Sequence, residues 1–302
     1  MRVFVTGGTG LIGAAIVQNL IKHGYQVLGL ARSPTSQKRL EEMGARSFAG
    51  DITTPEIWCN DLPDVDAVIH TACDFSDQMA EIDRNLLARL IPALHHMPGK
   101  TKFIYTGGTW LFPKSASGGF ITEDNAFEPL PDFSWMCDGI ARVIGDDQLH
   151  GVIIHPACVY GGGDNSHTGL LARDIETALT ENRVSVIGGD DITLPMIHAD
   201  DLADLYRLAL EDAEAGSSYL GVGINGVTNR QVSELIAQKF GGEECEITRT
   251  PVETAVAELG DWALGLAHHQ VMSSAKAINE LGWQAKHTDI AADIRSLSPA
   301  IS

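Results

Sequence analysis

Three glycines near the amino terminus, spaced three residues apart, have the clearest chemistry in the sequence. Gly7, Gly10 and Gly13 follow a short apolar run and precede a helical apolar pattern. Glycine at these positions allows a tight turn, close approach of the backbone to a pyrophosphate, and close packing of helix against strand. The amides at the start of the helix then point at the anion. We predict a dinucleotide site here, which also includes Thr9, Leu11 and Ile12.

The end of the second strand-like run indicates which dinucleotide binds. This run ends at Ala31, at the distance from the glycines where an NAD enzyme places an acidic residue on the ribose 2'-hydroxyl. The chain has Arg32 and Ser33 there instead. A guanidinium pairs well with a phosphate dianion, and a hydroxyl donates a further bond. We therefore expect NADP(H) rather than NAD(H). The alternative is that Arg32 is an ordinary surface arginine.

The elements that position these residues follow an alternating pattern. Strand-like apolar runs, each followed by a helical stretch, lie at 2–6, 26–30, 66–71, 102–106, 152–157 and 184–187. This alternation is typical of α/β proteins, and it predicts a Rossmann fold with a doubly wound parallel sheet. Such sheets bind their ligands at the carboxyl ends of the strands. The long Ser-, Gly- and Pro-rich loop at 114–134 is expected to line or cover that site.

Short motifs along nearly the whole chain point to one group of enzymes. They are Gly-Gly-Thr-Gly-Leu-Ile-Gly at the amino terminus, Ala-Gly-Asp51-Ile52, Val-Ile-His70-Thr71-Ala72, Phe103-Ile-Tyr-Thr106, Val159-Tyr160-Gly, His198-Ala-Asp200-Asp201 and Leu281-Gly-Trp283. This set resembles the extended and atypical short-chain dehydrogenase/reductases, which include the NAD-dependent epimerase/dehydratases. The resemblance implies further cofactor contacts at Asp51, Ile52, Thr71, Ala72, Thr106, Pro156 and Val159.

The same resemblance implies how the chain is divided. Residues 1–163 would form the NAD(P)-binding Rossmann domain, to which 186–222 would return. Residues 164–185 and 223–302 would form a smaller C-terminal α+β lobe for the substrate. Members of the family often pair through a four-helix interface, so a homodimer is also possible.

The catalytic residues depart from the family's pattern. Redox members use a Ser or Thr together with Tyr-x-x-x-Lys, but this chain has no tyrosine between Tyr105 and Tyr160. General acid–base work needs a group within hydrogen-bond reach whose pKa is near neutrality. Asp138 is our first candidate, since burial in an apolar cleft would raise its pKa; Ser134 and Thr109 are the others. The alternatives are that Asp138 only stabilises a helix amino terminus and that Ser134 caps it.

An apolar set of side chains would surround the substrate if the resemblance holds: Cys73, Phe75, Trp110, Trp135 and Met136. A core-packing role is the alternative for each of them. The second half of the chain has no cluster of basic residues for a sugar-nucleotide diphosphate. We therefore expect a small apolar or aromatic carbonyl or hydroxyl compound as substrate.

Two classes of function remain open from the sequence. The first is an NADP(H)-dependent oxidoreductase or epimerase in which substrate placement supplies most of the catalysis. The second is a non-redox protein on the same fold, either a cofactor-sensing regulator or a lyase or isomerase that retains the nucleotide.

Composition narrows the choice of partners. The net charge of -19 over 302 residues argues against nucleic acid and anionic membranes, which bind basic surfaces. No run of apolar residues is long enough to cross a bilayer, and no signal peptide is evident, so we expect a cytoplasmic protein. The five cysteines form no C-x-x-C pair, and the histidine pairs lack ligand partners at metal-binding spacing. We predict no metal site.

Overall fold

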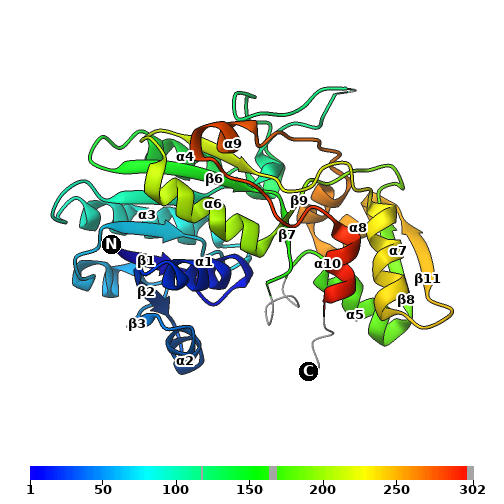
Figure 1. Ribbon diagram of the computed structural model, residues 1–302, viewed down its shortest axis with the longest axis horizontal. Coiled ribbons are helices and arrows are strands. Elements are labelled where there is room, and N and C mark those ends of the chain that lie inside the picture. Colours follow the sequence, from blue (N-terminus) through cyan, green and yellow to red (C-terminus); the bar gives the residue numbers. More distant parts are fainter. Residues whose placement is uncertain (117, 163–168, 298–302) are drawn as a thin grey trace. The chain divides into compact units, whose positions relative to one another are not determined.

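The computed structural model describes residues 1–116, 118–162 and 169–297 (Figure 1). Two compact units divide the chain. The first comprises Met1–Gly107, Trp135–His155 and Leu202–Tyr219, and the second comprises Gly108–Ser134, Pro156–Asp201 and Leu220–Ser302. The expected domain boundary at 163 lies outside the described residues. That boundary, with the return of 186–222, stays a prediction.

In the described chain, one seven-stranded sheet dominates, in the order β10-β6-β5-β4-β1-β2-β3. Its strands are β1 (Arg2–Thr6), β2 (Gln26–Ala31), β3 (Arg46–Ala49), β4 (Ala67–His70), β5 (Lys102–Thr106), β6 (His150–Pro156) and β10 (Ser218–Gly221). Pairing is parallel at every step from β3 to β6. The predicted α/β class with a doubly wound parallel sheet is therefore confirmed.

The apolar runs of the sequence become the centre of this sheet. Val3, Phe4 and Val5 of β1 have no exposed surface, as expected for a parallel strand covered on both faces. The helices of the first unit are α1 (Leu11–Lys22), α2 (Pro34–Glu42), α3 (Met79–Leu94), α4 (Met136–Ile144) and most of α6 (Ala199–Asp212). Helices α1 and α6 lie side by side (Figure 1), and Asn19 Nδ2 donates to Asp204 Oδ1 at 3.5 Å.

Two details of the predicted strands were wrong. Strand β3 was not expected, because Arg46–Ala49 is an edge strand with a mixed, partly exposed pattern rather than an apolar run. The apolar run at 184–187 does form a strand, β8 (Arg183–Ile187), but β8 pairs with β11 (Glu246–Thr250) in the second unit. Strand β10 joins the main sheet instead.

The second unit mixes helices with two small parallel sheets. Strand β8 pairs with β11, and β7 (Cys158–Tyr160) pairs with β9 (Met196–His198). Its helices are α5 (Ala172–Glu181), α7 (Asn229–Phe240), α8 (Val252–Leu259), α9 (Ala275–Leu281) and α10 (Ile290–Ser296). Val184, Ile236 and Ile294 are fully buried in its apolar core. This unit thus combines helices and strands, while its role as a substrate lobe stays a prediction.

Short 3-10 helices complete the described chain: Pro55–Ile57, Cys59–Asp61, Thr109–Leu111, Pro131–Phe133 and Asp261–Ala267. None of the helices within the described ranges has the length and apolarity that a bilayer span requires.

Candidate functional site

The turn between β1 and α1 has a shape that only glycine permits. Gly7 has φ +73, and a Cβ built on it would lie 2.8 Å from the Ala72 amide nitrogen and 2.9 Å from Thr71 Oγ1. A Cβ on Gly13 would collide with the carbonyl group of Gly7. The first glycine thus allows the tight turn and the last allows α1 to pack against it, which are the two roles inferred from their spacing.

Helix α1 presents its amino terminus at this turn. Gly10 is the N-cap, its amide donates to the Gly7 carbonyl at 3.0 Å, and no side chain among the described residues caps the helix. A Cβ on Gly10 would have a single described neighbour within 4 Å, the Gly7 carbonyl oxygen at 3.5 Å. The amides of Leu11 and Ile12 lie in the first helical turn, where intrahelical partners are missing. The turn therefore has main-chain donors for a pyrophosphate.

The turn lies at the point where the strand order of the sheet reverses. Strand β1 pairs with β2 on one side and with β4 on the other. The chain therefore runs from β1 to one side of the sheet, through β2 and β3, and then returns to β4 on the other side. After β4, Thr71 Oγ1 donates to the Thr6 carbonyl at 2.8 Å, which holds Thr71 and Ala72 beside the glycine turn. Open α/β sheets bind ligands at such a switch point. The structure thus brings these predicted cofactor residues together.

Two of the residues that follow β2 and β3, Ser33 and Asp51, form hydrogen bonds with residues close to them in sequence. Ser33 is the N-cap of α2 and forms a capping box with Ser36, so the Ser33 hydroxyl is already engaged. Arg32 is exposed, and no carboxylate of the described residues pairs with it. Asp51 Oδ1 accepts from the Thr53 amide at 3.0 Å and the Thr53 hydroxyl at 2.9 Å. The neighbouring residue Ile52 is partly exposed.

A buried chain of hydrogen bonds lies within the first unit. Thr6 Oγ1 and His70 Nδ1 are 2.6 Å apart, His70 Nε2 lies 2.9 Å from Asp83 Oδ1, and Tyr105 donates to Asp83 Oδ2 at 3.0 Å. Burial, and then the Asp83 charge, hold the pKa of Tyr105 well above its usual value. Gly139 of α4 allows close packing here, since a Cβ would lie 2.6 Å from the Tyr105 hydroxyl. The network therefore fixes α3 and α4 against β4 and β5.

Sequence reasoning missed two members of the first unit's polar core. Asp83 carries no motif, and its only signal is an acidic residue on the apolar face of α3. Tyr206 of α6 was also missed; its hydroxyl lies 2.6 Å from Thr106 Oγ1, which in turn donates to the His70 carbonyl at 2.7 Å. Thr106, predicted to contact the cofactor, thus already has two partners in the protein.

The three catalytic candidates have different surroundings. Asp138 is exposed in the first turn of α4, so the burial that motivated its selection is absent in this structure. Ser134 is exposed and donates to the Pro131 carbonyl at 2.9 Å; Trp135, not Ser134, is the N-cap of α4. Thr109 is buried, and its carbonyl accepts from Gln270 Nε2 at 2.8 Å. Asp138 belongs to the first unit and the other two to the second, so their convergence stays a prediction.

The predicted substrate residues are likewise divided between the units. Cys73, Trp135 and Met136 are partly buried in the first unit, where Phe75 is 80% exposed with φ 53. Trp110 lies in the second unit, packed on Phe133 with ring centroids 5.3 Å apart. The cofactor candidates Pro156 and Val159 also belong to the second unit. Their approach to the other site residues stays a prediction.

The partly buried cysteines are not activated nucleophiles. Burial raises the pKa of the Cys73 thiol to about 11. Burial also raises the pKa of Cys137, and the neighbouring Asp138 charge adds to that effect. Both side chains are therefore neutral thiols near neutral pH, whereas nucleophilic cysteines need a lowered pKa.

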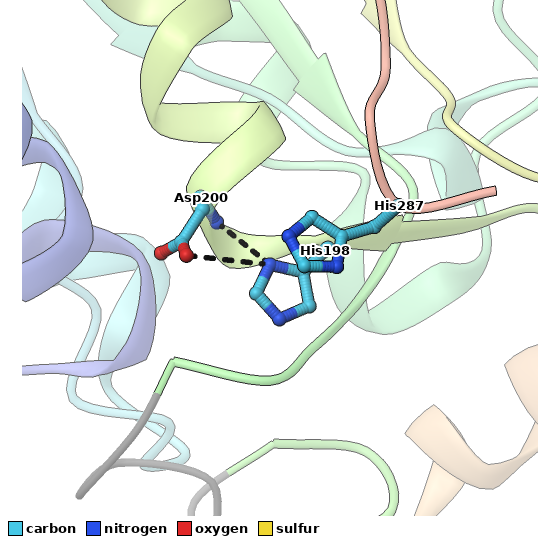
Figure 2. Close-up of side chains that lie close together, drawn as sticks. All are labelled: His198, Asp200 and His287. Carbon is cyan, nitrogen blue, oxygen red and sulfur yellow. Dashed lines mark hydrogen bonds and ion pairs between the residues drawn. The ribbon is translucent and has the colours of Figure 1, made fainter. Parts of the chain in front are cut away.

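A cluster in the second unit has the residue types of a metal site (Figure 2). The rings of His198 and His287 stack with centroids 3.6 Å apart, and the ligand atoms of these histidines and Asp200 lie within 4.8 Å of one another. However, the Asp200 amide, in the first turn of α6, donates to His198 Nδ1 at 3.2 Å. The lone pair of Nδ1 is therefore already used in a hydrogen bond. His287 Nδ1 lies 2.9 Å from Asp293 Oδ1. The two ring planes are also nearly parallel, at 9° to each other. Because the nitrogen lone pairs lie in those planes, they do not converge on one metal ion. We interpret the cluster as a helix cap.

The family comparison matches most of the chain. A model of the NAD dependent epimerase/dehydratase family matches residues 3–223, which includes the glycine turn, all the strands from β1 to β10 and helix α6. The matched region covers well over half of the 302 residues.

Individual relatives match at low to moderate identity. An uncharacterized protein of Saccharomyces cerevisiae is 28% identical over 98% of both chains. The 2-alkyl-3-oxoalkanoate reductase of Stenotrophomonas maltophilia is 37% identical over 73% of this chain and 68% of its own. Among solved structures, dTDP-glucose 4,6-dehydratase from Streptomyces venezuelae, with NAD and TYD bound, has a TM-score of 0.81 at 18% identity and covers 98% of this chain and 95% of that one. At that identity the likeness shows the fold alone.

Proposed function

Because the chain belongs to the NAD dependent epimerase/dehydratase family, we propose that it is an NADP(H)-dependent oxidoreductase or epimerase acting on a small apolar or aromatic carbonyl or hydroxyl compound. The observation that carries this proposal is the glycine turn, in which Gly7 and Gly13 have no room for a side chain and Gly10 opens onto the amino terminus of α1. When bound there, the cofactor supplies or accepts a hydride.

The preference for NADP(H) rests on the residues after β2. The 2'-phosphate of NADP(H) would lie beside Arg32, which no described carboxylate neutralises. The first-turn amides of α2 are close in sequence and add a favourable dipole. Because Ser33 is engaged in the capping box, Arg32 rather than the serine hydroxyl would supply most of the discrimination.

Catalysis would proceed without the usual tyrosine–lysine pair. None of the five tyrosines is followed by a lysine four residues later. Holding the substrate in line with the nicotinamide is worth about 7 to 11 kcal/mol at best, so placement can supply much of the rate. A proton would then come from water or from Asp138, the first catalytic candidate.

The substrate class is supported by one comparison and by the sequence. The Stenotrophomonas maltophilia relative, which is 37% identical to this chain, is named as a reductase of 2-alkyl-3-oxoalkanoates. That name favours an alkyl-substituted carbonyl compound over a sugar nucleotide. The test is a panel of such carbonyl compounds with NADPH, in which loss of the reduced nicotinamide absorbance must depend on the substrate. The same loss with sugar nucleotides alone would contradict the assignment.

A second candidate function is a non-redox use of the cofactor, as a sensor or within a lyase or isomerase. The missing Tyr-x-x-x-Lys pair favours it, together with the neutral thiols of Cys73 and Cys137. Tight binding of NADPH with no oxidation across a broad carbonyl panel would support this candidate over the first.

A further inference from the structure

The loop after β4 contains a phenylalanine in an uncommon backbone conformation. Of the described residues other than glycine, only Phe75 and Asn182 have a positive φ, which is 53° for each. Asparagine adopts this left-handed conformation more readily than other residues, whereas for a bulky side chain it is strained. Asn182 also has a structural reason for it, because it is the C-cap of α5. Phe75 does not end a helix, so its conformation needs another explanation.

The side chain of Phe75 is also poorly packed. It is 80% exposed, more than any other large apolar side chain of the described residues. So few contacts within the protein do not offset the strain of the backbone. Strained residues of this kind are concentrated at ligand-binding and catalytic sites. The two observations together indicate that Phe75 makes its main contact with a ligand.

Hydrogen bonds on both sides of Phe75 hold the loop in this shape. Asp74 Oδ1 accepts from the Ser76 amide at 3.2 Å, and Asp74 Oδ2 accepts from the Ser76 hydroxyl at 2.6 Å. The Ser76 hydroxyl oxygen accepts in turn from the Gln78 amide at 3.1 Å. The backbone that carries the Phe75 ring is therefore fixed before any ligand binds.

Phe75 lies close to the glycine turn within the first unit. A Cβ built on Gly7 would lie 2.8 Å from the Ala72 amide nitrogen, so Ala72 is next to the turn. Phe75 follows Ala72 by three residues, and at about 3.8 Å per residue their Cα atoms are at most about 11 Å apart. The Phe75 ring is therefore within reach of a dinucleotide bound at the turn.

The strand order indicates which half of the dinucleotide would face Phe75. Strand β2 lies on one side of β1 and leads to Arg32, the residue proposed to bind the 2'-phosphate of the adenosine half. Strand β4 lies on the other side of β1 and leads to Phe75. With the pyrophosphate at the turn after β1, the nicotinamide half would extend toward β4.

We propose that the ring of Phe75 packs against the nicotinamide half of bound NADP(H). The proposal rests on the proposed function, and it adds a cofactor contact to the substrate contact expected for this residue. Packing on the cofactor removes the ring from water, which stabilises the bound state. The free protein lacks that contact and still has the strained backbone.

The test is isothermal titration calorimetry on the full-length protein with NADPH and with 2'-phospho-ADP-ribose, which lacks the nicotinamide. Phe75→Asn removes the ring but suits the left-handed backbone. It is expected to weaken NADPH binding by about fivefold, the effect of losing a partly buried aromatic contact. Binding of 2'-phospho-ADP-ribose should be unchanged. Phe75→Tyr keeps the ring and should bind NADPH like the unmodified protein.

Urea unfolding separates this role from a role in packing. Because asparagine relieves the strain and Phe75 has few contacts to lose, Phe75→Asn should have an unfolding midpoint no lower than that of the unmodified protein. Phe120→Asn is the matched control, since it removes a ring that is 63% exposed at a residue without a positive φ. It should leave the binding of both ligands unchanged.

Three results would overturn the assignment of Phe75: unchanged NADPH affinity in Phe75→Asn, an equal loss of affinity for NADPH and 2'-phospho-ADP-ribose, or a lowered unfolding midpoint, which would indicate packing. Failure of the proposed function is distinguishable, because the unmodified protein itself would then not bind NADPH.

Discussion

The carbonyl group of Gly7 occupies the space that a Cβ on Gly13 would need. The same carbonyl accepts the Gly10 amide at 3.0 Å, so the three glycines form one interdependent turn. The geometry of the pyrophosphate donors therefore depends on the absence of side chains at Gly7 and Gly13.

Gly13→Ala should therefore damage both the fold and the cofactor site. The added methyl must push α1 away from the turn, and overpacking of this kind costs about 1 to 3 kcal/mol. We expect a lower free energy of unfolding in urea and NADPH binding weakened by about tenfold or more. Gly189→Ala is the control, since the nearest atom to its Cβ would be Ile192 Cγ1 at 3.7 Å. Normal NADPH affinity in Gly13→Ala would contradict the account.

Arg32→Ala should separate the two cofactors. Loss of a charge-assisted bond to the 2'-phosphate should weaken NADPH binding by about tenfold or more, while NADH binding stays unchanged. Arg46→Ala on the exposed start of β3 is the matched control. Equal effects on both cofactors, measured by calorimetry, would show that Arg32 does not recognise the phosphate.

Asp83 should stabilise the first unit through its two buried partners. Asp83→Ala leaves His70 and the Tyr105 hydroxyl without their acceptor, a loss of about 3 kcal/mol by analogy with broken buried pairs. Tyr105→Phe should cost about 1 kcal/mol. The double variant should cost less than the sum, because both changes break the same bond. Strict additivity in urea unfolding would mean that the two residues are not coupled.

Acid should destabilise the protein through His198. Burial, with the neighbouring His287, lowers the pKa of His198 below 6.5. Below that value the unfolded chain binds a proton that the folded chain resists, so the free energy of unfolding falls as pH decreases. His268, whose pKa is also lowered by burial, acts in the same direction. His198→Asn keeps a cap acceptor for α6 and should make the loss between about pH 7.5 and about pH 5.5 smaller. An unchanged slope would contradict the assignment.

Asp138→Asn tests the proposed proton donor. If Asp138 exchanges the proton, turnover should fall by about a hundredfold or more while NADPH affinity is unchanged. Asp147→Asn, also exposed and close in sequence, controls for the loss of one negative charge. Unchanged turnover would leave water as the proton donor.

The sequence could predict those parts of the fold that depend on local patterns. Buried parallel strands read as apolar runs, so β1, β2, β4 and β5 were recognisable, and the glycine spacing located the turn. The family was also recognisable from its motifs, and the expected class of NAD(P)-dependent enzyme is confirmed by the family match.

The remaining features depend on which segments meet in space. The partner of β8 is β11, about 60 residues later in the chain, and no local pattern specifies that pairing. Asp83 and Tyr206 gain their roles only when α3 and α6 pack beside β4 and β5. The sequence also favoured a buried Asp138, but the start of α4 leaves that carboxylate exposed.

Calorimetric titration of NADPH into the unmodified protein measures whether the glycine turn binds a dinucleotide. We expect heat that saturates at one cofactor per chain, with NADH binding more weakly. Absence of heat with both cofactors would contradict this expectation.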